Sequence, residues 1–194
     1  MESTFVIQEN ISDYELKVLF AKIRNMQEEI QYKDKYYNNI RNEYEIRQFI
    51  TSKGEMFTSE VLRKRHPNQD EIDGAYFFCS KGYSVIFLSE AGAGQHPDML
   101  IDGVLVEFKT VRSDIANSIS NRVKQAINKE HTEIPVIFLI EKSCYVNNLE
   151  LLRAIEKKQN LGDFRRNFKI AILIKNGQLP MVIKNMPGGS SEPA

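Results

Sequence analysis

HPDMLIDGVLVEFKTV, the sequence of residues 96–111, contains the strongest local folding signal in the chain. Asp102-Gly103 is a preferred pair for a tight two-residue turn, and runs of apolar residues flank it on both sides. We therefore expect a β-hairpin with strands over 98–101 and 104–111.

Alternation along these strands groups the polar side chains of the hairpin. Side chains two residues apart on a strand point to the same face, so Glu107 and Lys109 emerge together. Val106 and Phe108 point to the other face, where they would fill a core. Asp98 lies on the preceding strand, within cross-strand reach of Glu107. The hairpin therefore predicts two carboxylates and one ammonium at one end of a sheet.

The segments around this hairpin alternate between helical and extended patterns, bounded by Gly, Pro and capping residues. A continuous apolar run such as residues 134–140 is typical of a strand that is covered on both faces. The patterns predict an α/β protein with a mixed central sheet flanked by helices. In chain order we expect a helix over 71–80, strands over 83–88, 98–101 and 104–111, a helix over 115–129, a strand over 134–140, a helix over 149–158, and a second hairpin with strands over 168–174 and 179–183.

The N-terminal segment has a different character. Residues 13–52 contain no Gly or Pro, and apolar residues recur at alternating steps of three and four from Leu16 onward, which predicts one long helix. Its apolar seam has two interpretations. Either it mediates self-association into a homo-oligomer or docking of a partner, or it packs back onto its own domain. Thr58 to Arg65 predicts a further short helix.

Three regions follow from this pattern. We expect a helical arm, with the character of a coiled coil, over 1–54, an α/β domain over 55–186, and a disordered tail over 187–194.

Composition narrows the classes of function. The 26 basic and 26 acidic residues cancel, which argues against a protein that coats nucleic acid over a broad basic surface. Local basic clusters exist nevertheless, and Arg63 to His66 is one of them. Two cysteines without metal-ligand spacing fit free thiols in a reducing cytosol. With neither a signal-peptide pattern nor a membrane-length apolar run, we expect a cytoplasmic site of action and no membrane partner.

The acidic hairpin suits phosphodiester chemistry. Asp98 and Glu107 supply the oxygen ligands that one or two hard divalent ions, Mg²⁺ or Mn²⁺, prefer. Lys109 would orient a water nucleophile or stabilise charge on the attacked phosphate.

Pro97-Asp98 followed by Glu107-Phe108-Lys109 resembles the core motif of the PD-(D/E)xK nuclease superfamily. The wider stretch, over about residues 68–142, is similar to nuclease domains at the C-terminal ends of bacterial contact-dependent inhibition and related polymorphic toxins, many of which cut tRNA. The resemblance implies an endonuclease that acts on RNA, with DNA as the alternative substrate. It also implies an immunity protein as a partner.

Further site residues follow from the same resemblance. Family members often add a carboxylate from the first core helix, where Glu71 matches by position, and some place polar residues on the helix after the catalytic strand, where Gln125 and Arg122 lie. The nucleic-acid contacts expected near the site are Arg112, Lys124 and Lys129.

Two other interpretations stay open. In metal-independent RNase toxins of the barnase and colicin type, a base and cationic residues suffice because RNA supplies its own 2′-hydroxyl nucleophile. His96, Lys109, Thr110 and Arg112 would then act. The last interpretation is a catalytically silent binding or assembly module that associates through the N-terminal helix.

Overall fold

The computed structural model describes residues 4–29, 43–88, 97–111, 136–140, 170–175 and 180–186, with the single positions 121 and 153. The chain forms two compact units, one of residues Ser12–Phe108 and the other of Met1–Ile11 with Lys109–Ala194. Apart from positions 121 and 153, the predicted helices over 115–129 and 149–158 lie outside the described residues, as does the tail after 186.

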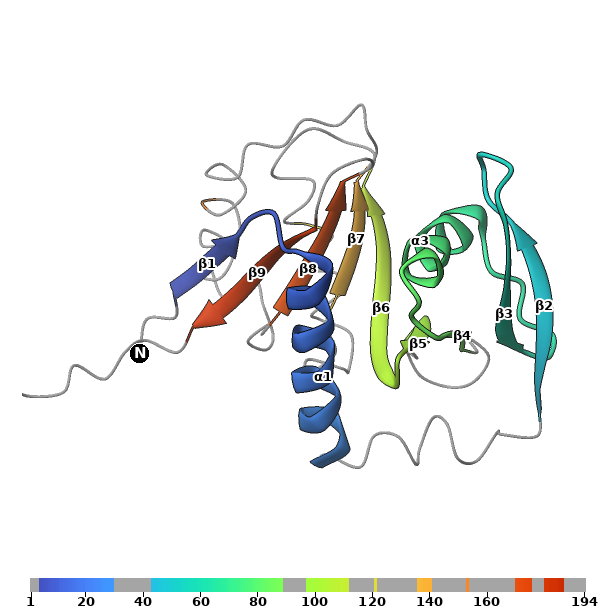
Figure 1. The fold of residues 1–194 in the computed structure, drawn as a ribbon, viewed down its shortest axis with the longest axis horizontal. Helices are drawn as coiled ribbons and strands as arrows, with labels where there is room; N and C mark the ends of the chain where they lie inside the picture. The colour runs from blue at the N-terminus through green and yellow to red at the C-terminus, as the bar shows by residue number, and fades with distance from the viewer. Residues whose placement is uncertain are drawn as a thin grey trace, which may run out of the picture. The chain divides into compact units, whose positions relative to one another are not determined.

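The unit of residues 12–108 is built on a mixed five-strand sheet. Its strand order is β2-β3-β4-β5-β6, in which β3 and β4 are parallel and the other neighbours are antiparallel. The predicted α/β class is therefore confirmed. Its elements are α1 (Asp13–Glu29), β2 (Tyr44–Ile50), β3 (Met56–Leu62), α3 (Gln69–Ser80), β4 (Val85–Phe87), β5 (Met99–Ile101) and β6 (Val104–Val111), shown in Figure 1.

The other unit contains four described strands in the order β1-β9-β8-β7. The parallel pair is β7 with β8, and β9 is antiparallel to both of its neighbours. The predicted strand over 134–140 and the predicted second hairpin are confirmed, whereas β1 was not expected from the sequence. The bounds are β1 (Thr4–Gln8), β7 (Val136–Ile140), β8 (Ile170–Lys175) and β9 (Met181–Met186).

Helix α1 begins at a reciprocal cap. The Glu15 carboxylate accepts the Ser12 N–H at 2.8 Å, and the Ser12 hydroxyl accepts the Glu15 N–H at 3.3 Å. The apolar seam, at Leu16, Leu19 and Ile23, is buried. Met26, the next residue of the predicted seam, is exposed, so the seam packs back onto its own chain from Leu16 to Ile23.

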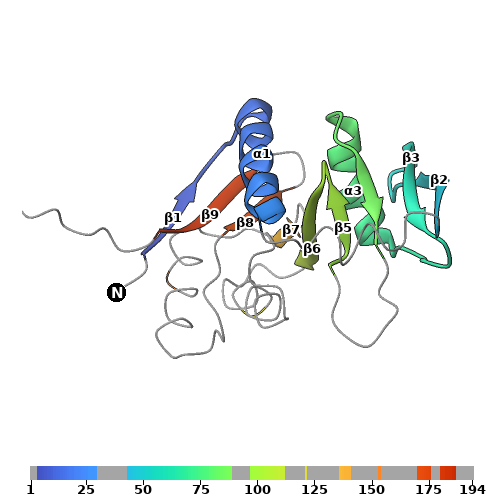
Figure 2. The ribbon, with the colours of Figure 1, turned by 90° about the horizontal axis from the view of Figure 1, so that it is seen from below.

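Two helix predictions are wrong. Residues 44–50, expected at the end of the long N-terminal helix, form β2, and most of the predicted helix over 58–65 is β3, which lies beside β2 in Figures 1 and 2. Gly54, with φ of 85°, supports the turn between them. The N-terminal region is therefore a strand, a helix and a hairpin strand in its described parts, not a helical arm.

Helix α3 connects the parallel strands β3 and β4 and covers one face of the sheet. Asn68 is its N-cap, and Gly82, with φ of 82°, follows its end. Phe57 of β3 packs on Tyr76 with ring centroids 5.7 Å apart. Phe20 of α1 packs on Phe78 at 5.6 Å, so the two helices share one aromatic core.

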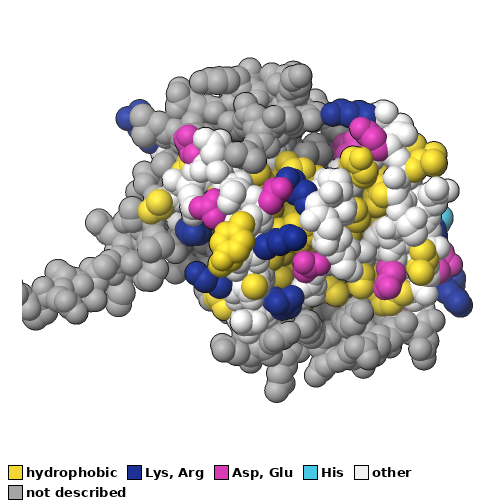
Figure 3. All heavy atoms as spheres, in the orientation of Figure 1, with side chains coloured by type: hydrophobic (Ala, Val, Ile, Leu, Met, Phe, Trp, Pro, Cys, Tyr) yellow, Lys and Arg dark blue, Asp and Glu magenta, His cyan; other side chains and the backbone are white. Residues whose placement is uncertain are grey.

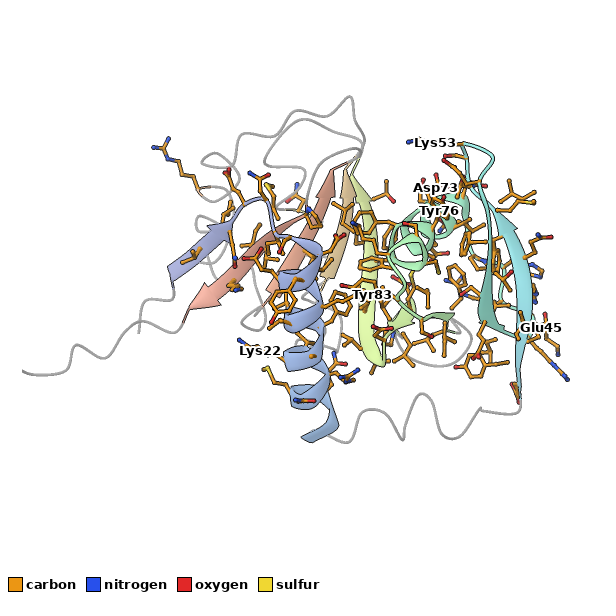
Figure 4. All side chains as sticks on the ribbon, viewed as in Figure 1. Lys22, Glu45, Lys53, Asp73, Tyr76 and Tyr83 are labelled. Atoms are coloured by element: carbon orange, nitrogen blue, oxygen red, sulfur yellow. The ribbon has the colours of Figure 1, made fainter. Side chains whose placement is uncertain are left out.

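The tip of the β2–β3 hairpin is tied to the first turns of α3. Ser52 donates to the Asp73 carboxylate from its N–H at 2.8 Å and from its hydroxyl at 2.5 Å. Burial raises the pKa of Asp73, but hydrogen bonds from Ser52 and Gln69 and the charge of Lys53 outweigh it, so the pKa lies below its usual value of 3.8. Figure 4 shows Lys53 and Asp73 together at this end of the hairpin.

The turn of the central hairpin has the predicted form. Asp102 and Gly103 have φ values of 46° and 78°, and positive φ at both positions is what the favoured two-residue turn requires.

Helix α1 forms hydrogen bonds with the backbone of β6. The buried Gln27 amide accepts the Leu105 N–H at 2.8 Å and donates to the Leu105 carbonyl at 3.2 Å, as a neighbouring strand would.

Within the ranges that the structure describes, no helix combines the length and the apolar character that crossing a membrane requires.

Replacing Tyr83 by Phe is expected to remove part of the protein's loss of stability in alkali. Burial, followed by the charges of Asp102 and Asp13, raises the pKa of Tyr83 to about 12. The unfolded chain loses this proton near pH 10 and the folded chain near 12, so the folded state loses stability as pH rises between these values. Chemical denaturation from pH 9 to 12 should show a shallower fall for Tyr83→Phe.

At pH 7 the same variant should be as stable as the wild type or more stable by about 1 kcal/mol, because among the described atoms the buried hydroxyl has no hydrogen-bond partner. Tyr14→Phe, at an exposed position on α1, is the control. A fall as steep in Tyr83→Phe as in the wild type would contradict the assignment.

Candidate functional site

Asp98 lies one residue before β5 and is held by the backbone on both sides. Its carbonyl accepts the Leu88 N–H at 3.0 Å, and its own N–H donates to the Val106 carbonyl at 3.1 Å. Its Oδ2 accepts the Phe108 N–H at 2.7 Å. The residue is 5% exposed, so these contacts place a carboxylate in the interior, directed at the backbone of β6.

Glu107 is the second buried carboxylate, and it is 6% exposed. Met99 and Val106 form the last pair between β5 and β6; Asp98 directly precedes Met99, and Glu107 directly follows Val106. The structure therefore places the two buried carboxylates, here called the acidic pair, at the same end of the β5–β6 hairpin.

The face of β6 opposite Glu107 is fixed by Phe108. A Cβ built on Gly74 of α3 would lie 2.2 Å from Cζ of the Phe108 ring, so the ring lies directly against the helix backbone. Because side chains alternate, Glu107 points away from α3. Lys109, partly exposed, follows Glu107 by two positions in β6, and Thr110, also partly exposed, comes next.

Glu71 has partners other than the acidic pair. Its Oε1 lies 2.8 Å from Nη2 of Arg65 in a buried ion pair, and its Oε2 accepts the Asn68 N–H at 2.8 Å. The Glu71 N–H in turn donates to the Asn68 side chain, which completes a capping box. Both oxygens thus serve the start of α3, and a metal-ligand role for Glu71 stays a prediction that requires exchange of these contacts.

The donor set of Asp98 and Glu107 fits a hard divalent ion. Two carboxylates supply oxygen ligands, and water and phosphate oxygens complete such a shell. Over the described ranges, no group of three or more His, Cys, Asp and Glu side chains is arranged to hold a metal. The other predicted site residues, His96, Arg112, Arg122, Lys124, Gln125 and Lys129, lie outside those ranges.

The sequence interpretation missed two residues that shape this region. Arg65 was grouped with its exposed basic neighbours, yet it is buried and donates to the Leu88 carbonyl at 2.8 Å. Gly74 was passed over as an ordinary helix position. A glycine in the middle of a helix is unfavourable by about 1 kcal/mol relative to Ala, and that cost was the available signal for a close approach.

No protein-family model matches the chain, and no curated protein matches it. Among solved structures, the chain is similar to the CdiA-CT/CdiI toxin and immunity complex from Burkholderia pseudomallei. The TM-score is 0.40 and 17% of residues are identical, over 59% of this chain and 81% of that chain. A similarity of this size establishes neither a shared fold nor a shared activity.

Gly74→Ala is expected to destabilise the protein by about 1 to 3 kcal/mol, because the added methyl group overlaps the Phe108 ring and one of the two must move. Urea denaturation measures the change. The double variant Gly74→Ala/Phe108→Leu should recover part of the loss. If Gly74→Ala is as stable as the wild type, the ring does not lie against α3.

Proposed function

We propose that the protein is a metal-dependent endonuclease that hydrolyses phosphodiester bonds. Asp98 and Glu107 are the proposed metal-binding residues of its active site. The observation that carries the proposal is the pair of buried carboxylates at one end of the β5–β6 hairpin. Two carboxylates at this position supply oxygen ligands of the kind that Mg²⁺ and Mn²⁺ prefer.

Each residue has a defined task in this proposal. Asp98 and Glu107 would hold the ion, and the Phe108 N–H fixes the direction of the Asp98 carboxylate. When bound, a divalent ion lowers the pKa of a coordinated water and offsets charge on the attacked phosphate. Lys109 shares a face with Glu107 by strand alternation, and its ammonium would orient the attacking water or stabilise the developing negative charge.

The substrate and setting are the finer part of the proposal. RNA, and tRNA in particular, is proposed on the resemblance of about residues 68–142 to nuclease domains of bacterial toxins. The same resemblance supports action in the cytoplasm of a bacterial cell and an immunity protein that blocks the site. DNA is the alternative substrate.

Glu107→Gln is expected to lower the rate of cleavage by at least about 100-fold, because the neutral amide is a poor ligand for a hard cation. The assay incubates the protein with total tRNA, other RNA and plasmid DNA, in Mg²⁺ or Mn²⁺ and then in EDTA, and follows fragments on gels. Asp98→Asn should behave like Glu107→Gln. Glu60→Gln is the matched control, because Glu60 is an exposed carboxylate on β3.

Loss of cleavage in EDTA and in both site variants, with full activity in Glu60→Gln, is the result the proposal requires. Cleavage that survives EDTA and Glu107→Gln but is lost in His96→Ala would overturn it in favour of metal-independent RNA cleavage. Absence of cleavage for every substrate and both metals would also overturn it.

A further inference from the structure

The strand β3 ends in a positively charged turn. Its four residues, Arg63 to His66, follow Leu62 directly and are here called the basic turn. Arg63, Lys64 and His66 are exposed, whereas Arg65 is buried. The four residues therefore divide into one inward anchor and three outward side chains.

Arg65 anchors the basic turn from within. Its Nη2 pairs with Glu71 at 2.8 Å, and its Nε donates to the Leu88 carbonyl at 2.8 Å. Its own carbonyl accepts Nη1 of Arg47 at 2.8 Å, and its N–H closes the turn onto Leu62 at 2.9 Å. These contacts join the turn to β2, to α3 and to the end of β4, so three neighbouring elements anchor it.

The three outward side chains lack polar partners among the described residues. Across the described part of the chain, the side chains of Arg63, Lys64 and His66 form no hydrogen bond or ion pair with the protein. Lys64 also has a φ of 69°, in the left-handed region that is unfavourable for a lysine. A rigid turn that presents unpaired cations, one of them on a strained backbone, fits an external anionic ligand better than an internal structural role.

The basic turn lies at the end of the sheet where Asp98 enters it. Because β3 and β4 are parallel, their carboxyl ends share one edge of the sheet. Arg65 binds the Leu88 carbonyl, and the Leu88 N–H binds the Asp98 carbonyl at 3.0 Å. Two hydrogen bonds through one residue therefore connect the turn to the acidic pair.

We propose that the basic turn binds phosphate groups of the nucleic acid that the site of Asp98 and Glu107 cleaves. This identification of the ligand rests on the proposed function. A chain of zero net charge must attract a polyanion locally. Among the described side chains on the face in Figure 3, basic and acidic groups are interspersed. Arg63 and Lys64 supply the guanidinium and ammonium groups that bind phosphate oxygens.

The test measures binding without cleavage. Fluorescently labelled tRNA and a DNA duplex are titrated with the protein in EDTA at several salt concentrations, which gives Kd and its salt dependence. Arg63→Gln/Lys64→Gln removes two charges from the basic turn. The control, Lys22→Gln/Lys53→Gln, removes two exposed charges, one from α1 and one from the tip of the β2–β3 hairpin. In Figure 4, Lys53 lies at the opposite end of β2 from Glu45. Glu45 pairs with Val61, at the end that carries the basic turn.

The basic-turn variant is expected to raise Kd at least about tenfold at 0.1 M salt, and to reduce the slope of log Kd against log salt by about 1.4 to 1.8. The control should leave both nearly unchanged. Equal Kd and slope in the two double variants, or no binding of either nucleic acid by the wild type, would overturn the proposal.

The two proposals fail separately. If the wild type binds tRNA through the basic turn but cleaves nothing with either metal, the nuclease proposal fails and the phosphate-binding turn stands. If cleavage depends on Glu107 while Kd does not depend on Arg63 and Lys64, the reverse holds. Circular dichroism and urea denaturation of each variant ensure that the comparison is made between folded proteins.

Discussion

The contact between the Phe108 ring and the backbone of Gly74 determines what strand β6 can present. With no side chain at Gly74, the ring reaches the surface of α3, and alternation then directs Glu107 to the other face of the strand. The hydrogen bond from the Phe108 N–H to Oδ2 of Asp98 directs the Asp98 carboxylate toward β6. Phe108 thus packs against α3 through its ring and binds Asp98 through its N–H.

The buried ion pair of Arg65 and Glu71 extends this arrangement to the neighbouring elements. A buried ion pair adds little stability by itself, because desolvation offsets the attraction between the charges. Here it connects the end of β3 to the start of α3, and Arg65 also holds Leu88, the residue that binds the Asp98 backbone. The ion pair therefore fits a structural role, in which it positions the basic turn relative to the backbone of Asp98.

The parts of the fold that could be predicted from the sequence are those with strong local signals. The Asp102-Gly103 turn and the apolar strands depend on neighbouring residues only. Strand β2 was mistaken for helix because Ile46 and Ile50 are exposed, so its apolar residues do not mark the buried face. Glu71 was ambiguous for a related reason, since an acid in the first turn of a helix suits both a cap and a metal site. The partner of Glu71 is Arg65, and the burial of Arg65 can be seen only in the tertiary structure.

The central claim is that Asp98 and Glu107 form one divalent-cation site, and isothermal titration calorimetry with Mn²⁺ and Mg²⁺ tests it without any substrate. The account predicts saturable Mn²⁺ binding by the wild-type protein, with affinity at least about tenfold weaker in Asp98→Asn and in Glu107→Gln, since each removes an anionic oxygen ligand. Identical affinities in the wild type and both folded variants, or no binding by the wild type, would contradict it.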